Sequence, residues 1–93
     1  MDTPIEIVWT DDVQHRAKLR GFDLAKIEQI VRYSPERYFD TATERAVAVG
    51  RHDDILVLIP FEVRGRSLTP ITVHATTRQQ ISFRLKTGRF TNE

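Results

Sequence analysis

The sequence contains no cysteine, which excludes disulfide bonds, thiolate metal sites and a cysteine nucleophile. Long hydrophobic runs are also missing, since the longest one, residues 55–61, is interrupted by Pro60 and is far too short to cross a bilayer. The N-terminus has no basic region followed by an apolar one, so a secretory signal is not expected. Together these absences predict a cytoplasmic protein that has no membrane partner.

Repeats, low-complexity tracts and linkers are equally absent, which argues against a modular or disordered chain. The 93 residues are 40% hydrophobic and 29% charged and include five Phe, one Trp and two Tyr, a composition typical of a folded protein. A chain of this length has room for one modest core but not for a second lobe. We therefore expect a single domain over residues 1–93, in which residues 89–93 fray.

Acidic residues are scarce in the last 30 residues, where Glu93 stands alone against six Lys or Arg side chains. Residues 1–63 have the opposite balance, with eight basic and twelve acidic side chains, so the net charge of +1 hides two halves of opposite sign. Such asymmetry indicates a polyanionic partner, because guanidinium groups bind phosphates in pairs. For the charge pattern alone, an ordinary solvated surface is the favoured interpretation.

Two helix signals occur in the first third of the chain. The first segment follows Thr10 and two carboxylates and stops at Gly21, which predicts a short helix over residues 12–19. The second follows Asp23 and ends before Pro35, which is incompatible with a continuing helix. Its apolar residues recur with helical spacing and form one stripe that a core would cover. The stripe consists of Leu24, Ile27, Ile30 and Val31.

A third helix is predicted over residues 77–86. Thr76 or Thr77 can cap its start, and Gly88 suits its end. Its apolar residues Ile81, Phe83 and Leu85 are predicted to lie in the core. The position of Phe90, in the segment that follows, is left open.

Between the second and third helices lie three segments with strand character, residues 46–49, 55–63 and 68–75. They are separated by two short polar stretches, which predicts an antiparallel meander. The sequence therefore predicts an α+β fold with two N-terminal helices, an antiparallel sheet of three to four strands and a C-terminal helix.

Two positions in the basic third of the chain suit phosphate chemistry. Arg64 and Arg66 flank Gly65 in the turn between two apolar strands, where two guanidinium groups would project together. His74 and Arg78 lie where the last strand gives way to the third helix, and a histidine there can act as a general acid or base. A solvated turn in the first case, and a simple helix start beside a polar sheet face in the second, are the competing interpretations.

Further basic residues extend this surface. Arg84 and Lys86 lie on the third helix, and Lys18 belongs to a second basic cluster on the first helix. The three histidines have no metal-ligand spacing, no glycine-rich phosphate loop is present, and no serine lies in a nucleophile elbow. We therefore expect no metal and no cofactor.

Three segments taken in order resemble the BrnT family of toxins, which belongs to the RelE/ParE superfamily of type II toxin-antitoxin systems. They read VWTD at residues 8–11, leading through a basic helix to RGF at 20–22; ERAVAVGR at 44–51; and ITVHATTR at 71–78. The resemblance spans roughly residues 5–86, with 44–51 as its best segment. The stretch 15–22 is also similar to related RelE-like domains of unknown function.

The resemblance implies a small RelE-like fold with a twisted antiparallel sheet, and a metal-independent ribonuclease encoded beside an antitoxin that binds it. In such enzymes, basic residues on the sheet and on the final helix hold the RNA, activate the ribose 2′-hydroxyl and neutralise transition-state charge. The implied catalytic residues are His74, Arg78 and Lys18, and the implied RNA-binding residues are Arg64, Arg66, Arg84 and Lys86.

Two other functions stay open on the sequence alone. One is a catalytically inactive module whose basic face binds an acidic or disordered protein segment, since charge complementarity needs no catalysis. The other is plain RNA binding, which at a net charge of +1 would be weak and strongly salt-dependent.

Overall fold

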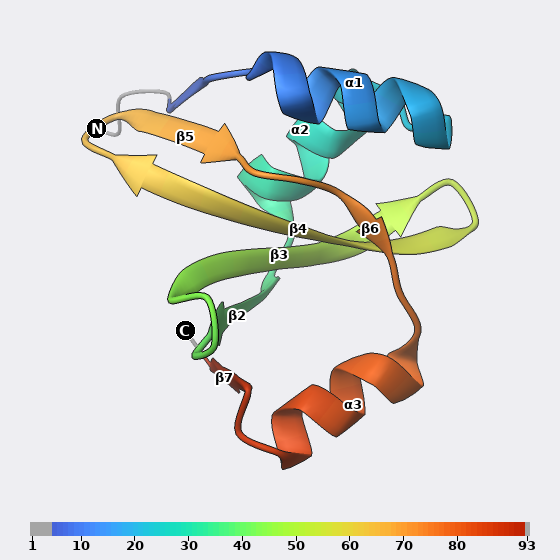
Figure 1. Cartoon of the computed structure of the whole chain (residues 1–93), viewed down its shortest axis with the longest axis vertical. Coiled ribbons are helices and arrows are strands. Elements are labelled where there is room, and N and C mark those ends of the chain that lie inside the picture. The colour runs from blue at the N-terminus through green and yellow to red at the C-terminus, as the bar shows by residue number, and fades with distance from the viewer. Residues whose placement is uncertain (1–4, 93) are drawn as a thin grey trace.

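The computed structural model describes residues 5–92, which form three helices and one seven-stranded sheet (Figure 1). None of the helices in this range is long and apolar enough to cross a membrane. In chain order the elements are β1 (Glu6–Ile7), α1 (Asp11–Arg20), α2 (Leu24–Tyr33), β2 (Glu36–Asp40), β3 (Arg45–His52), β4 (Ile55–Arg64), β5 (Ser67–Pro70), β6 (His74–Ala75), α3 (Arg78–Lys86) and β7 (Phe90–Asn92).

The helices lie where the sequence predicts them, and local capping explains their limits. Thr10 accepts a hydrogen bond from the Val13 amide at the start of α1, and Gly21 ends this helix in the left-handed region with a φ of 73°. Asp23 caps α2 by accepting from the backbone of the next turn. At α3 the cap is Thr77, which accepts from the Gln80 amide.

The sheet corrects the predicted fold class. Its strands follow the order β1-β5-β4-β3-β2-β7. Strand β6 lies outside this order and pairs with β4, at a different part of β4 than β5 does. All pairings are antiparallel except that of β1 with β5, which is parallel. The expected antiparallel sheet of three to four strands is therefore wrong, because the sheet is mixed and has seven strands. The strands that the sequence did not predict are β1 and β7, which have only two and three residues, and β2, which has five.

The segment expected as one strand over residues 68–75 is two strands, and Pro60 explains the interruption. The Pro60 carbonyl oxygen accepts a hydrogen bond from the Ile71 amide. In an antiparallel pair the nitrogen and the carbonyl group of one residue face the same neighbouring strand, so the Pro60 nitrogen also faces the segment that contains Ile71. Because a proline nitrogen carries no hydrogen to donate, the backbone hydrogen bonding between the two strands is interrupted at this point. The chain pairs with β4 as β5 before the gap and as β6 after it (Figure 1).

The expectation that residues 89–93 fray is also wrong for the residues that the structure describes. Residues 90–92 form β7, which pairs with β2, and the Phe90 side chain is only 1% exposed. Phe90 stacks on Tyr38 with the ring centroids 5.6 Å apart. Residue 93 lies outside the described residues.

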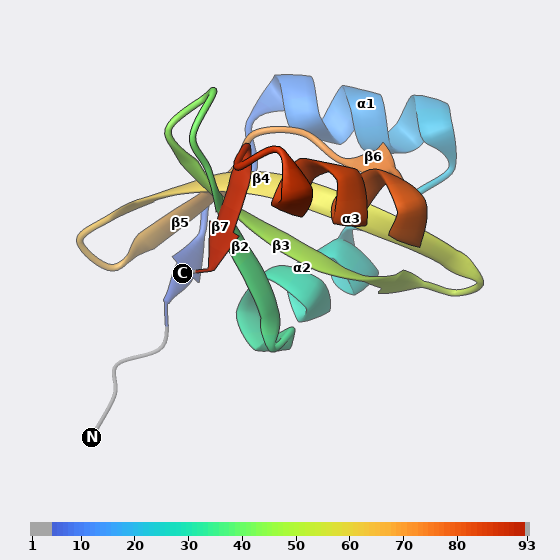
Figure 2. The same ribbon diagram turned by 90° about the horizontal axis from the view of Figure 1, so that it is seen from below.

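Two hydrophobic clusters occupy opposite faces of β3 and β4, because successive residues of a strand point to opposite sides. Cluster 1 joins α1 and α2 to the sheet, and Gly50 of β3 allows close contact there, since a Cβ at this position would lie 2.8 Å from Ile30 Cγ2. Cluster 2 lies under α3 and β7 and consists of Val47, Val49, Leu56, Leu58, Ile81 and Phe90. Figure 2 shows α3 and β7 together on one side of the molecule.

Helix α3 buries less than the sequence predicts. Ile81 is buried as expected, but Leu85 is 37% exposed and Phe83 is 67% exposed. The assignment of Phe83 to the core is wrong because α3 buries only Ile81 against the sheet, while Phe90 fills the adjacent space from β7.

Candidate functional site

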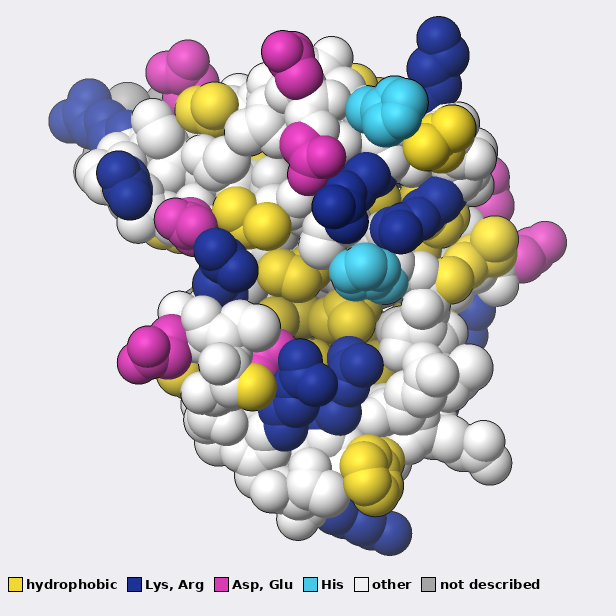
Figure 3. Space-filling view, viewed as in Figure 1, with side chains coloured by type: hydrophobic (Ala, Val, Ile, Leu, Met, Phe, Trp, Pro, Cys, Tyr) yellow, Lys and Arg dark blue, Asp and Glu magenta, His cyan; other side chains and the backbone are white. Residues whose placement is uncertain are grey.

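A groove of about 410 Å³ lies between α3 and the strands β4 and β6. Its floor is apolar and is formed by Leu58, Pro60 and Ile71. Figure 3 shows this face, on which Lys and Arg side chains gather on both sides of a hollow whose floor is hydrophobic, with a histidine at its border. The groove thus combines an apolar surface with cationic walls.

The strand pattern places His74 on this groove. His74 of β6 pairs with Leu58 of β4, and directly opposed residues in an antiparallel pair share one face of the sheet. The preceding residue, Val73, points to the other side and is fully buried in cluster 1. His74 therefore points toward the groove, and His74 and Thr72 both line it.

Three arginines reach the groove from three different elements. Arg84 comes from α3, Arg45 from the start of β3, and Arg89 from the turn before β7. Two of them are paired with carboxylates: Arg45 Nη2 lies 3.2 Å from Glu62 Oε1, and Arg89 Nε lies 3.2 Å from Asp40 Oδ1.

Arg84 differs from the other two arginines. Its guanidinium carbon lies 5.4 Å from the centre of the Phe90 ring, so a buried aromatic residue supports it. Within residues 5–92 no carboxylate lies at ion-pair distance from Arg84. Arg84 is therefore a positioned cation whose charge is available to a ligand.

Asp40 is the one acidic side chain on the groove, and it is already occupied. Both of its oxygens accept from Arg89, and its Oδ1 also accepts from the amides of Ala42 and Thr43. Burial alone would raise the pKa of Asp40, but these hydrogen bonds lower it below its usual value. The carboxylate therefore stays ionised and fixes the turn that carries Arg89.

Two further polar groups on the groove have unusual surroundings. Burial, and then the positive charges of Arg20, Arg16 and Arg84, lower the pKa of His74 below its usual value. The imidazole is therefore neutral at pH 7. The Thr72 hydroxyl oxygen is buried and has no hydrogen-bond partner among the described residues, which is unusual for a polar atom that borders a cavity.

The structure brings only two of the predicted site residues together, His74 and Arg84. Arg78, predicted to be catalytic, does not line the groove and instead binds Glu36 at the start of β2 with an Nη1 to Oε2 distance of 2.6 Å. The Tyr38 hydroxyl donates to the same Glu36 oxygen. Burial and this hydrogen bond raise the pKa of Tyr38 to about 12. Arg78 thus ties α3 to the sheet.

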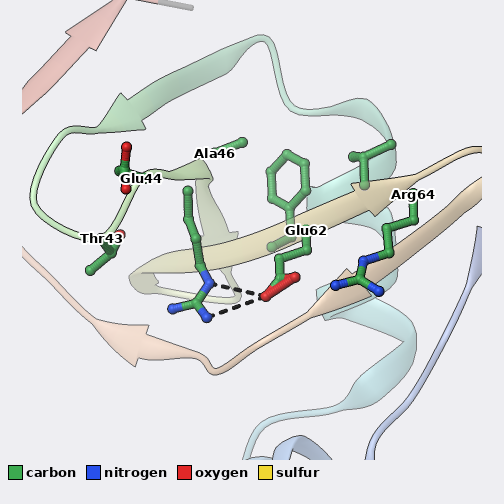
Figure 4. A pocket seen from close by; sticks show the side chains of 8 residues that line it. Thr43, Glu44, Ala46, Glu62 and Arg64 are labelled. Carbon is green, nitrogen blue, oxygen red and sulfur yellow. Dashed lines mark hydrogen bonds and ion pairs between the residues drawn. The ribbon is translucent and has the colours of Figure 1, made fainter.

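The other predicted residues lie elsewhere. Lys18 borders a shallow hollow on α1 with Phe22 and Leu24, and neither Arg66 nor Lys86 lines the groove. Arg64 borders a second hollow of about 520 Å³, beside the end of β4 (Figure 4). There its charge and that of Arg45 are matched by Glu44 and Glu62, so this hollow is less suited to an anion than the groove is.

Three arginines outside the seven predicted site residues border or contact the groove region: Arg45, Arg89 and Arg20. Arg20 contacts His74 from the end of α1, 54 positions earlier in the chain. A sequence signal existed for Arg20, which belongs to the basic run before Gly21. Nothing in the sequence alone indicates that this basic run contacts β6, the strand that follows the interruption after β5.

Comparison with known proteins finds no matching family model, no similar curated protein and no similar solved structure.

Proposed function

We propose that the groove binds the phosphodiester backbone of RNA. The observation that carries this proposal is the guanidinium of Arg84, which has no carboxylate partner within residues 5–92 and projects beside an apolar floor. An arginine binds phosphate through two parallel hydrogen bonds, and an apolar floor accepts the face of a ribose or a base. Arg89 and Arg45 supply further donors around the same space.

We propose further that the bound RNA is cleaved through its own 2′-hydroxyl, as the resemblance to BrnT-like toxins implies. The 2′-oxygen forms a bond to the adjacent phosphorus while the bond from that phosphorus to the 5′-oxygen breaks, and water takes the hydroxyl proton and protonates the departing 5′-oxygen. The reaction needs no protein nucleophile, and the protein has to stabilise the extra negative charge that develops on the phosphorus-bound oxygens. Fixed guanidinium groups suit that task. The positive charge around the groove also disfavours a bound metal cation. The biological role that fits is the toxin of a type II toxin-antitoxin pair.

A second candidate function is the binding of an acidic protein segment without catalysis. One observation favours it: two of the groove arginines, Arg45 and Arg89, already hold carboxylates within the chain. An antitoxin segment that is rich in Asp and Glu would offer Arg84 the same kind of group. The two functions share a surface, and RNA cleavage distinguishes them.

We expect Arg84→Ala to weaken the binding of a short single-stranded RNA by about 10- to 100-fold, the effect of losing one hydrogen-bonded charge pair. Lys86→Ala is the matched control, because it removes one positive charge from the same helix without touching the groove. Fluorescence anisotropy at two salt concentrations measures both variants. An equal loss in the two variants would show that only overall charge attracts RNA and would reject the groove as the site.

Catalysis is tested separately by inducing the wild-type chain, Arg84→Ala and Lys86→Ala in a bacterial host. We expect growth arrest and loss of messenger RNA with the wild type and with Lys86→Ala, and normal growth with Arg84→Ala. Normal growth in all three cultures, with soluble protein present, would contradict the ribonuclease and favour the protein-binding function.

A further inference from the structure

The contact between Arg20 and His74 determines which ring nitrogen of the neutral histidine carries the hydrogen. The Arg20 Nη1 atom lies 3.3 Å from His74 Nδ1 and also donates to the Val73 carbonyl oxygen. A guanidinium group has five N–H donors and no acceptor, and it does not lose its proton in proteins. The Nδ1 atom must therefore accept, so the single hydrogen of the neutral imidazole sits on Nε2.

We propose that Arg20 is a positioning residue that holds neutral His74 in the Nε2–H tautomer, so that the imidazole meets a ligand in the groove as a hydrogen-bond donor. The identity of that ligand, an RNA phosphate, rests on the proposed function. A resting Nε2–H group cannot accept a proton from the ribose hydroxyl. His74 therefore binds a phosphate oxygen rather than acting as the general base that the sequence suggests.

The backbone fixes Arg20 for this role. Arg20 is the last residue of α1, and Gly21 turns the chain away in the left-handed region directly after it. Val73, whose carbonyl oxygen accepts from Arg20, lies in the gap between β5 and β6 that follows from Pro60. The interrupted ladder thus provides an acceptor that holds Arg20 beside His74.

The surrounding charges act in the same direction. Arg20 and Arg16 on α1 and Arg84 on α3 face His74, and the same groove is lined by Arg45, Arg89 and a single carboxylate, Asp40. After burial, the first three of these charges lower the pKa of His74, which keeps the imidazole neutral and leaves Nδ1 free to accept. A bound phosphate opposes this effect and should raise the pKa of His74.

The test is ¹⁵N NMR of the free full-length protein, in which the two ring nitrogens of His74 report the tautomer directly. In the wild type we expect Nε2–H. In Arg20→Ala the tautomer ratio should fall by about tenfold, toward that of an unrestrained histidine, which is the effect of one hydrogen bond to a charged group. The pKa of His74 should rise at the same time.

Arg16→Ala is the matched control. It removes the same charge from the same helix, but Arg16 pairs with Asp12 at 3.2 Å instead of holding His74. We expect the tautomer ratio of this variant to equal that of the wild type. A wild-type Nδ1–H signal, or an unchanged ratio in Arg20→Ala, overturns the proposal. Because Arg20 is exposed at a helix end, its loss leaves the fold intact, which circular dichroism checks.

A second arm adds a 2′-O-methyl RNA oligonucleotide, which binds but cannot be cleaved. We expect it to raise the pKa of His74 in the wild type. If the tautomer depends on Arg20 but the oligonucleotide leaves the His74 signals unchanged, the RNA function fails while the positioning role stands. The two proposals can therefore fail separately.

Discussion

Replacing Phe90 with alanine should lower the free energy of unfolding by about 3–5 kcal/mol, the usual cost of removing a buried aromatic side chain. Phe90 is 1% exposed, stacks on Tyr38 and belongs to cluster 2, which has only six buried members. Small domains are stable by about 5–15 kcal/mol, so much of the total would be lost. Urea denaturation followed by circular dichroism measures the change.

Phe83→Ala is the matched control for this prediction. Phe83 is the same residue type on the neighbouring helix, but it is 67% exposed. We expect its truncation to change the free energy of unfolding by no more than about 0.5 kcal/mol. Equal losses in the two variants would contradict the assignment of Phe90 to the core. Phe90→Ala should also weaken RNA binding, because the ring supports the guanidinium of Arg84.

Replacing Ile27 with aspartate should abolish the folded state. Ile27 is 0% exposed at the centre of cluster 1, where a carboxylate would find no partner, and burying an unpaired charge costs several kcal/mol. We expect loss of the cooperative thermal transition and of dispersed NMR signals. Ile27→Val removes one methylene and should cost only about 0.5–1.5 kcal/mol.

Tyr33→Asp tests whether position, rather than the new charge itself, causes this effect. Tyr33 lies on the same helix and is 70% exposed. The variant should fold as the wild type does. A cooperatively folded Ile27→Asp protein would mean that α2 does not present this face to the sheet.

The helices were predictable because their signals are local. A capping side chain, an apolar stripe and a glycine or proline at the end lie within one segment, as with Asp23 before α2 and Pro35 after it. The sheet was less predictable, because pairing partners are distant in the sequence. Residues 6–7 pair with 67–68, and residues 38–40 pair with 90–92, and such short strands show no periodicity.

The sequence predicted the kind of site, but it did not predict which residues form it. The basic C-terminal third indicated phosphate binding, and two of the seven predicted residues, His74 and Arg84, lie on the groove. Arg78 was assigned on its place at a helix start, but Glu36, 42 positions earlier, binds it. Which arginines are paired and which are available depends on such long-range contacts, and a linear pattern does not contain them.

The helix beside the groove and the strand that forms its floor differ in how many residues they bury. Helix α3 has nine residues and buries only Ile81, whereas β4, which supplies Leu58 and Pro60 of the floor, runs through both hydrophobic clusters. Elements with few buried contacts open by local unfolding without disrupting the rest of a domain. The backbone amides of α3 should therefore exchange with solvent before those of β3 and β4. A ligand that bridges the floor and Arg84 would slow that exchange, so occupancy of the groove would be recorded in the local stability of one helix.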